Sequence, residues 1–441
     1  MAGSRAGDEA QRGTSAAASP YANAGYRWYV MVVLILVFAC HAMDRGLPGI
    51  LIEPIRHEFK LKDSQLGLIS GTGYGLAFAL AVIPMGMLSD RVNRRNMLAV
   101  ILTAWSACTA LGGLAGNVTS LILARIGVGV AESGALPISM PLLGDIFPPR
   151  QRGLAFGVYY INSSLGALLA SVAGALIAAS YGWRAAFMLV GAPGVLLALL
   201  LVLTVKEPVR GGMEAAPVED GPRPPTPGLA AALAYVARQP ALICLIAAVG
   251  LVSLISVALG AWTAAFFMRA HHLGLKEVGV ILGIGGGLCG AVGPPAFGWL
   301  SDRLSARDAA WTLRIVWMCL AGSFACSMVM LFTPVLILAV GGYIVADFLR
   351  SGFAALTFAV ITTHSPAPMR GTIMSFVQLL AVLMGFGVGP LAVGWLSDLY
   401  GGGVSIRYAL ANSVMLFVVV VPLYMAASRF LYGPAPAQGR P

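Results

Sequence analysis

Long apolar runs alternate along this chain with short polar segments. A run of about 20 apolar residues can cross the hydrocarbon core of a bilayer as an α-helix. Runs of this kind begin near Trp28, Leu66, Met97, Thr119, Gly153 and Arg184, and again near Ala241, Val278, Thr312, Val335, Thr372 and Arg407. The pattern predicts an all-α membrane protein with twelve transmembrane helices, arranged as two pseudo-repeats of six.

The segment between the two sets of runs is charged and rich in proline, so it cannot span a membrane and is typical of a linker. The first residues are rich in Ala, Gly and Ser and lack the apolar core of a signal peptide, which favours a disordered cytoplasmic tail. The expected division is a tail at 1–25, a first six-helix bundle at 26–204, a cytoplasmic linker with an interfacial helix at 205–239, a second bundle at 240–432, and a cytoplasmic tail at 433–441.

A short motif recurs at the ends of these runs. It appears as Gly86-Met-Leu-Ser-Asp-Arg91, as Gly298-Trp-Leu-Ser-Asp-Arg303, and without the final arginine at 394–398. Its recurrence half a chain apart indicates a duplicated bundle of two parallel repeats. An aspartate at a helix end can face a helix N-terminus, so the motif predicts a cytoplasmic gate in which Asp145 is a partner for Arg91. The expected gate residues are Gly86, Asp90, Arg91, Asp145, Asp302 and Arg303. The alternative is that these residues only anchor and cap the helices.

Composition supports a lipid environment. Hydrophobic residues make up 58% of the chain and charged residues 10%, and the mean hydropathy is +0.84. A soluble domain could not hide so much apolar surface. The six cysteines all lie in apolar runs without a Cys-x-x-Cys pair, so we expect no disulfide framework, metal site or cofactor.

The net charge of +10 could suggest a nucleic-acid partner, but the basic residues lie in short loops between the runs. Most of them fall in cytoplasmic segments if both termini lie inside, which predicts that orientation in a bacterial inner membrane. The residues expected on the outer side are Arg56, Lys60, Lys62, Arg184, Arg269, Lys276 and Arg407.

Ionisable residues within the apolar runs are the strongest functional signal. They are Asp44, Arg45, Arg125, Glu132, Asp347 and Arg350. Each costs at least about 2.5–3.5 kcal/mol at a helix centre, so such residues are functional by default. The helical rise places Asp44 and Arg125 at similar depth, with Glu132 two turns deeper on nearly the same face as Arg125. We expect these charges to surround a water-accessible cavity that opens to each side in turn.

Proton exchange is the chemistry that this pattern favours. Dehydration raises the pKa of a carboxyl group and a nearby arginine lowers it, so Asp44 and Glu132 could bind and release protons as the cavity changes sides. Arg125 and Arg350 would hold an anionic head group, and Asp347 can neighbour Arg350 at i,i+3. Candidate polar residues of the cavity are His41, Tyr159, Tyr160 and Asn162. The alternative is a set of static ion pairs that brace the bundle.

Residues 27–432 resemble transporters of the major facilitator superfamily. The segment 86–95 resembles the loop 2–3 signature of that superfamily, with Asn93 where glycine is common. His41-Ala-Met-Asp44-Arg45 resembles an Asn-x-x-Asp-Arg pattern of the spinster and anion:cation symporter branches, with His41 in place of Asn. Further segments that resemble the spinster-like, bacterial-type branch are 125–134, 141–153, 205–214 and 261–269.

The resemblance implies a twelve-helix carrier in which Asp44 and Glu132 are proton-sensing acids and Arg45 and Arg125 are their charge partners. Known substrates of that branch are lipid-like, such as lysophospholipids and sphingosine phosphate. We therefore expect a proton-coupled secondary transporter that works by alternating access and moves an amphipathic or anionic small molecule. The alternative is a symporter of protons with sugar acids or other carboxylates.

Other classes of function fit less well. No Gly-x-Ser-x-Gly, Walker or His-Glu-x-x-His motif is present, so we expect no enzyme. A substrate-gated sensor would need an added output domain, and a passive channel would trap ions at charge clusters of opposite sign. The expected partners are protons, the bilayer and a small-molecule or lipid substrate, without nucleic acid, and the expected state is a monomer.

Overall fold

A computed structural model describes residues 20–89, 91–209 and 228–433. The described part of the first half begins with the 3₁₀-helix η1 and contains one π-helical segment, η2. Its elements are η1 (Pro20–Ala22), α2 (Ala24–Ile50), α3 (Ile52–Phe59), α4 (Asp63–Gly67), η2 (Leu68–Thr72), α5 (Gly73–Ser89), α6 (Arg94–Gly113), α7 (Val118–Glu132), α8 (Ala135–Ile146), α9 (Pro149–Tyr159) and α10 (Ile161–Thr204).

The second half contains two π-helical segments, η3 and η4, and the 3₁₀-helix η5. Its elements are α11 (Leu229–Ala237), α12 (Pro240–Ala270), α13 (Leu275–Leu282), η3 (Gly283–Cys289), α14 (Gly290–Ser305), α15 (Trp311–Phe332), α16 (Leu336–Ser351), α17 (Phe353–Thr363), α18 (Arg370–Val382), η4 (Leu383–Val388), α19 (Gly389–Leu399), η5 (Gly403–Ser405), α20 (Ile406–Met415) and α21 (Phe417–Tyr432).

These elements join into membrane-spanning stretches, as the apolar runs predicted. Eleven stretches of the described residues are long and apolar enough to cross a bilayer, and one of them covers 56 residues, Pro149–Thr204. That stretch is broken at Gly182, whose φ of 85° lies in the left-handed region that glycine tolerates best. Because a single span needs only about 20 residues, the break divides α9 and α10 into a fifth and a sixth span. The protein is therefore an all-α membrane protein of the predicted twelve-span type.

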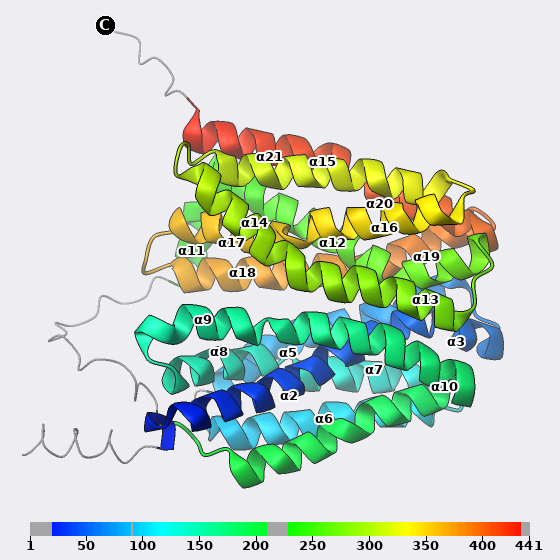
Figure 1. The fold of residues 1–441 in the computed structure, drawn as a ribbon, viewed down its shortest axis with the longest axis horizontal. Coiled ribbons are helices and arrows are strands. Elements are labelled where there is room, and N and C mark those ends of the chain that lie inside the picture. Colours follow the sequence, from blue (N-terminus) through cyan, green and yellow to red (C-terminus); the bar gives the residue numbers. More distant parts are fainter. Residues whose placement is uncertain (1–19, 90, 210–227, 434–441) are drawn as a thin grey trace, which may run out of the picture.

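Helices α2–α10 lie together on one side of the molecule and α11–α21 on the other (Figure 1). We call the end where Thr204 and Leu229 lie the linker end, and the opposite end the far end. The proposed division into two bundles with a linker stays a prediction, and its segments 1–19, 210–227 and 434–441 lie outside the described residues.

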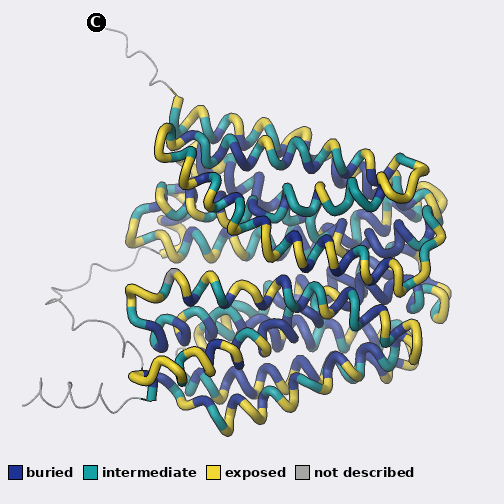
Figure 2. The backbone as a smooth tube through the Cα atoms, in the orientation of Figure 1, coloured by how far each residue is buried: buried dark blue, intermediate teal, exposed yellow. Residues whose placement is uncertain are grey.

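Many large apolar side chains are exposed along the outer faces of the helices. Leu80, Leu203 and Ile337 are 81%, 72% and 78% exposed, and exposed backbone runs along the periphery of both halves (Figure 2). A protein in water rarely exposes so much apolar surface, whereas a membrane protein turns such side chains toward lipid. The surface thus agrees with a multi-pass membrane protein.

The two halves touch closely in the part of each span nearer the far end. A Cβ atom at Gly71 of η2 would lie 2.4 Å from the Pro390 ring of α19. A Cβ at Gly279 of α13 would lie 2.5 Å from the carbonyl oxygen of Ser171 in α10. Glycine is needed at these points because the helix backbones approach so closely. Toward the linker end the ribbons of the halves diverge (Figure 1).

We expect Gly71→Ala to weaken the contact between the halves at the far end. The added methyl would overlap Pro390, and overpacking costs about 1–3 kcal/mol. Spin labels at Lys60 and Lys276, both exposed at the far end, should report a population with longer distances. Gly86→Ala is the matched control, since its nearest neighbour, Pro137 of the same half, would be 3.9 Å away. Identical distance distributions in wild type and Gly71→Ala would contradict this.

Candidate functional site

A cluster of polar side chains lies inside the first half, between α2, α5 and α7. We call it the acid cluster, and its members are His41, Asp44, Tyr74, Arg125 and Glu132. The Tyr74 hydroxyl donates a hydrogen bond of 2.7 Å to Oε2 of Glu132, and Nε2 of His41 lies 3.4 Å from the same oxygen. Nη1 of Arg125 donates to the backbone carbonyl of Asp44 over 3.3 Å. The structure thus brings together the residues of spans 1 and 4 that the sequence singled out.

Helix geometry explains why these side chains meet. His41 and Asp44 are three residues apart on α2, and Arg125 and Glu132 are seven apart on α7, so each pair shares a helix face. Tyr74 stands at the start of α5, directly after the π-helical segment η2. Its hydroxyl covers Glu132 from a third helix. Sequence reasoning missed Tyr74, because an aromatic residue in an apolar run gives no signal of a polar partner.

The acid cluster is enclosed in this conformation, and the predicted water-accessible cavity that opens to each side in turn stays a prediction. The exposed fractions are 6% for His41, 2% for Asp44 and Arg125, and 0% for Tyr74 and Glu132. Oδ1 of Asp44 and Oε1 of Glu132 are buried without a hydrogen-bond partner among the described residues. The cluster is enclosed because Tyr74 of α5 covers Glu132 and Trp105 of α6 packs against His41. Both acids are therefore buried, and each has one carboxylate oxygen that receives no hydrogen bond from the described residues.

The arginines face aromatic rings in this conformation. Arg125 lies over the Tyr74 ring, with its Cζ 5.4 Å from the ring centroid. Arg45 is half-buried and lies over the Phe386 ring of η4, with its Cζ at 4.5 Å. Within the described ranges, neither arginine forms an ion pair with Asp44 or Glu132. The charge-partner roles of Arg45 and Arg125 thus stay predictions.

Asp347 and Arg350 form a separate pair in the second half. Both lie on α16, and Nη2 of Arg350 donates to Oδ1 of Asp347, as the i,i+3 spacing predicted. Their side chains are 18% and 9% exposed. No hydrogen bond or ion pair of the described residues joins them to the acid cluster.

The candidate polar residues of span 5 divide into buried and exposed positions. Tyr159 is 1% exposed and its hydroxyl has no partner among the described residues, while Asn162 is buried and donates to the backbone carbonyl of Tyr159. Tyr160 is 59% exposed. Tyr159, the last residue of α9, packs edge-on against Phe38 of α2, with the ring centroids 5.2 Å apart. It therefore contacts the helix that carries His41 and Asp44.

The predicted gate residues that the structure describes lie at the linker end. Asp145 forms an ion pair of 2.5 Å with Arg94, and its expected pairing with Arg91 stays a prediction. Arg94 is buried at the start of α6 and points toward α8, whereas Arg91 is exposed in the preceding turn. Asp302 and Arg303 are exposed and Gly86 is half-buried on α5. Asp90 lies outside the described residues.

A buried ionic network joins the halves at the far end instead, and sequence reasoning missed it. We call it the far-end network, and its members are Glu53, Arg56, Asp63, Arg269, Ser397 and Asp398. At its centre, Arg269 of α12 binds Oε1 of Glu53 through Nε at 2.7 Å and both oxygens of Asp63 at 2.7 and 2.9 Å. The exposed fractions of Glu53, Asp63 and Arg269 are 4%, 2% and 9%.

Asp398 and Ser397 of α19 complete the far-end network. The two carboxylate oxygens of Asp398 accept hydrogen bonds of 2.9 Å from the backbone N–H groups of Asp63 and Ser64, and thereby cap α4. The Ser397 hydroxyl donates to Asp63 over 2.6 Å. The sequence did contain one signal for this network, the third copy of the Ser-Asp motif at 397–398. This copy ends span 11 at the far end, whereas the other two copies end their spans at the linker end.

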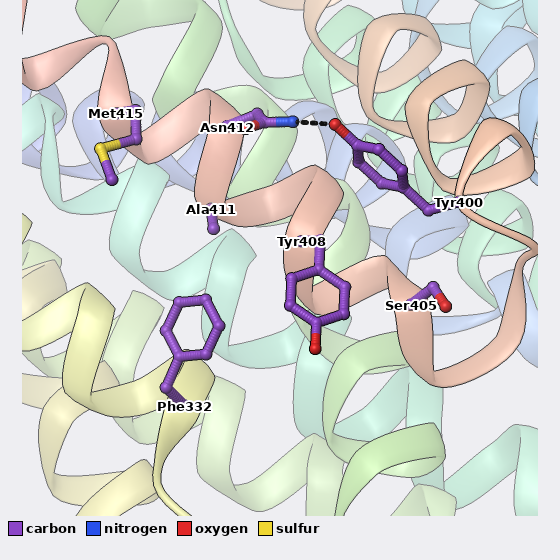
Figure 3. Close-up of a pocket in the computed structure, with 7 residues that line it drawn as sticks. All are labelled: Phe332, Tyr400, Ser405, Tyr408, Ala411, Asn412 and Met415. Atoms are coloured by element: carbon purple, nitrogen blue, oxygen red, sulfur yellow. Dashed lines mark hydrogen bonds between the residues drawn. The ribbon is translucent and has the colours of Figure 1, made fainter.

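A cavity of about 560 Å³ lies elsewhere, at the far end of the second half (Figure 3). Its lining residues are Phe332, Tyr400, Ser405, Tyr408, Ala411, Asn412 and Met415. It contains no charged side chain, and Nδ2 of Asn412 donates to the Tyr400 hydroxyl at its edge over 2.6 Å. In the described ranges, no three His, Cys, Asp or Glu side chains converge as metal ligands. The acid cluster therefore remains the candidate site.

Twelve spans in two groups, with unmatched acids buried beside the contact between them, define a multi-pass membrane transporter and not an enzyme. Comparison with known proteins agrees. A family model described as Major Facilitator Superfamily matches residues 34–380. The chain belongs to this superfamily.

Relatives support the same assignment. An MFS-type efflux pump of Mycolicibacterium smegmatis is 31% identical over 416 residues, which cover 92% of each chain. A probable galactarate/D-glucarate transporter of Bacillus subtilis is 25% identical over 78% of this chain and 80% of that relative. The crystal structure of a bacterial homologue of the human lysosomal transporter Spinster, inward-facing and unoccupied, covers 94% of this chain and 100% of that chain, with 25% identity and a TM-score of 0.83.

Proposed function

We propose that this protein is a proton-coupled secondary transporter that works by alternating access, with Asp44 and Glu132 as the groups that exchange protons. The observation that carries the proposal is the burial of both acids, for which the described part of the chain provides no ion pair with an arginine or lysine. An isolated carboxylate is costly to bury in the ionised form and inexpensive to keep ionised in water. The enclosed state therefore favours proton binding by Asp44 and Glu132, and the hydrated state favours proton release.

His41 extends this proton site. Its Nε2 lies 3.4 Å from Glu132 and is otherwise without a hydrogen-bond partner in the described residues. An imidazole at this distance can pass a proton to the carboxylate after a small rearrangement. His41 is the proposed relay between Glu132 and the water that reaches the cluster.

The proposed direction of opening follows from charge and from the contact between the halves. The positive-inside bias assigns the linker end to the cytoplasm of a bacterial inner membrane. The halves touch at the far end and diverge at the linker end. Under this orientation the conformation is inward-facing, in line with the conformation named for the Spinster homologue.

The proposed substrate is an amphipathic or anionic small molecule of the lysolipid or sphingoid-phosphate kind. Arg45 is half-buried, with its guanidinium 5.7 Å from the Tyr74 ring of the acid cluster, and Arg350 lies in the second half beside Asp347. These two arginines are the proposed contacts of the head group. Arg125 is enclosed, so it is not proposed to touch the head group in this conformation. A sugar acid is the second candidate, because a relative of 25% identity is a probable galactarate/D-glucarate transporter.

Transport in proteoliposomes tests the function. A thermal-shift screen of lysolipids, sphingoid phosphates and sugar acids at acidic and neutral pH would first select the substrate. We expect the selected compound to accumulate only while a pH gradient is imposed at clamped membrane potential, and a protonophore to stop accumulation. Accumulation that follows a sodium gradient, or that ignores the protonophore, would refute proton coupling.

A further inference from the structure

Glu132 is linked to the second half of the protein through one aromatic contact. The hydroxyl of Tyr74 donates to Glu132 over 2.7 Å, and the ring of Tyr74 packs edge-on against the ring of Phe386, with centroids 5.2 Å apart. Phe386 belongs to η4 of span 11, whereas the acid cluster belongs wholly to the first half. A change at the carboxylate can therefore reach the other half through Tyr74.

Arg45 contacts the same phenyl ring. Its guanidinium lies 4.5 Å from the Phe386 centroid and 5.7 Å from the Tyr74 centroid. A cation over an aromatic ring contributes about 0.5–2 kcal/mol, and more when both groups are dehydrated. Phe386 thus contacts both the hydrogen-bond donor to Glu132 and the cation that neighbours the acids.

The backbone brings this ring to a tight point between the halves. A Cβ at Gly75 would lie 2.7 Å from both the Phe386 Cβ and the Gly387 nitrogen. No room exists for the two spans to approach further, so the position of the Phe386 ring and the contact of η4 with α5 depend on each other. Phe386 is partly buried against the core of the first half.

We propose that Tyr74 and Phe386 are positioning residues that couple the proton occupancy of Glu132 to the contact between the halves. The inference rests on the proposed function of Glu132. The hydrogen bond from the Tyr74 hydroxyl holds the Tyr74 ring against Phe386 while Glu132 is enclosed, and a protonated Glu132 can still accept this bond through its carbonyl oxygen. Proton loss leaves an ionised carboxylate that is costly to keep enclosed, so ionisation of Glu132 favours its hydration and loosens the contact between Tyr74 and Phe386.

Other charged and titratable groups also face Glu132 and must respond together. They are His41, Asp44 and Arg45 of α2, Tyr74 of α5 and Arg125 of α7. Helix α6 contributes Trp105, which packs edge-on against His41 and does not titrate. Among these groups, Tyr74 and Arg45 also contact the second half through Phe386.

The test uses two separate measurements, one for the distance between the halves at the linker end and one for the protonation of Glu132. Spin labels at the exposed residues Arg150 and Arg307 report the opening of the full chain in nanodiscs. The infrared carboxyl band that Glu132→Gln removes reports the proton. In wild type we expect both signals to change between acidic and neutral pH.

In Tyr74→Phe and Phe386→Leu we expect the pH-dependent distance change to fall by at least about half, while the carboxyl band still titrates. Phe386→Tyr should keep the distance change. Phe78→Leu is the matched control, because Phe78 packs on Tyr74 with centroids 5.9 Å apart but belongs to the first half. A full distance change in Phe386→Leu with a titrating band would overturn the coupling role alone. A wild-type band that does not titrate would overturn the proposed function and the coupling role together.

Discussion

Glu132→Gln is expected to reduce proton-driven transport to the level of protein-free liposomes. Glutamine keeps the size of the side chain and can accept the Tyr74 hydrogen bond, but it cannot bind or release a proton. Because the neutral amide resembles the protonated acid, exchange of substrate across the membrane without a gradient should persist. Asp44→Asn should behave in the same way.

Two assays check this result. One measures substrate uptake driven by an imposed pH gradient, and the other measures substrate exchange with equal pH on both sides of the membrane. Glu58→Gln is the matched control, since Glu58 is 43% exposed at the far end and bound to Arg184. Wild-type rates of gradient-driven uptake in both Glu132→Gln and Asp44→Asn would show that these acids are structural. Loss of exchange as well as uptake would indicate a folding defect, which thermal stability would reveal.

Arg269→Ala is expected to open the far end. The substitution leaves Glu53 and Asp63 buried without their cation, and breaking a buried ion pair in this way costs about 3–5 kcal/mol. That cost applies only while the far end is closed, because water solvates both acids once it opens. The population of the open state relative to the closed state should therefore rise by about two to four orders of magnitude.

Spin labels at Lys60 and Lys276 would measure this change as a longer distance. Arg56→Ala is the control, because Arg56 is 30% exposed and lies 3.6 Å from Glu53, a pair worth about 1 kcal/mol or less. Removing the charges together in the triple variant Glu53→Gln, Asp63→Asn, Arg269→Leu should restore much of the closed state. An unchanged distance in Arg269→Ala would show that the far-end network does not hold the halves together.

The twelve spans could be predicted from the sequence because the bilayer allows few alternatives: a spanning segment must be helical and apolar over about 20 residues. The boundary between spans 5 and 6 was placed closely too, because the sixth run was expected to begin near Arg184 and the chain turns at Gly182. Arg184 interrupts the apolar stretch at 149–204 and gave the signal for this boundary.

The candidate site was partly predictable for a similar reason. Arg125 and Glu132 are seven residues apart, so their shared face follows from helix geometry alone. Whether that face meets water or another helix depends on packing, and here α5 covers it. Arg269 shows the same limit: it was expected in an outer segment, but α12 continues through Ala270 and buries it between two acids. Contacts between distant segments are not encoded by local spacing.

The chain that leaves the sixth span is fastened to the first half for several residues. The Glu207 carboxylate accepts hydrogen bonds from the backbone N–H groups of Arg94 and Arg95, at 3.1 and 2.7 Å, and the Tyr26 hydroxyl accepts one from the Lys206 N–H at 2.9 Å. The segment that connects the two halves therefore starts only after Glu207 and runs to Leu229. At about 3.3–3.6 Å per residue its reach is about 70 Å. A segment of this length does not by itself limit the movement of the halves that the proposed alternating access requires.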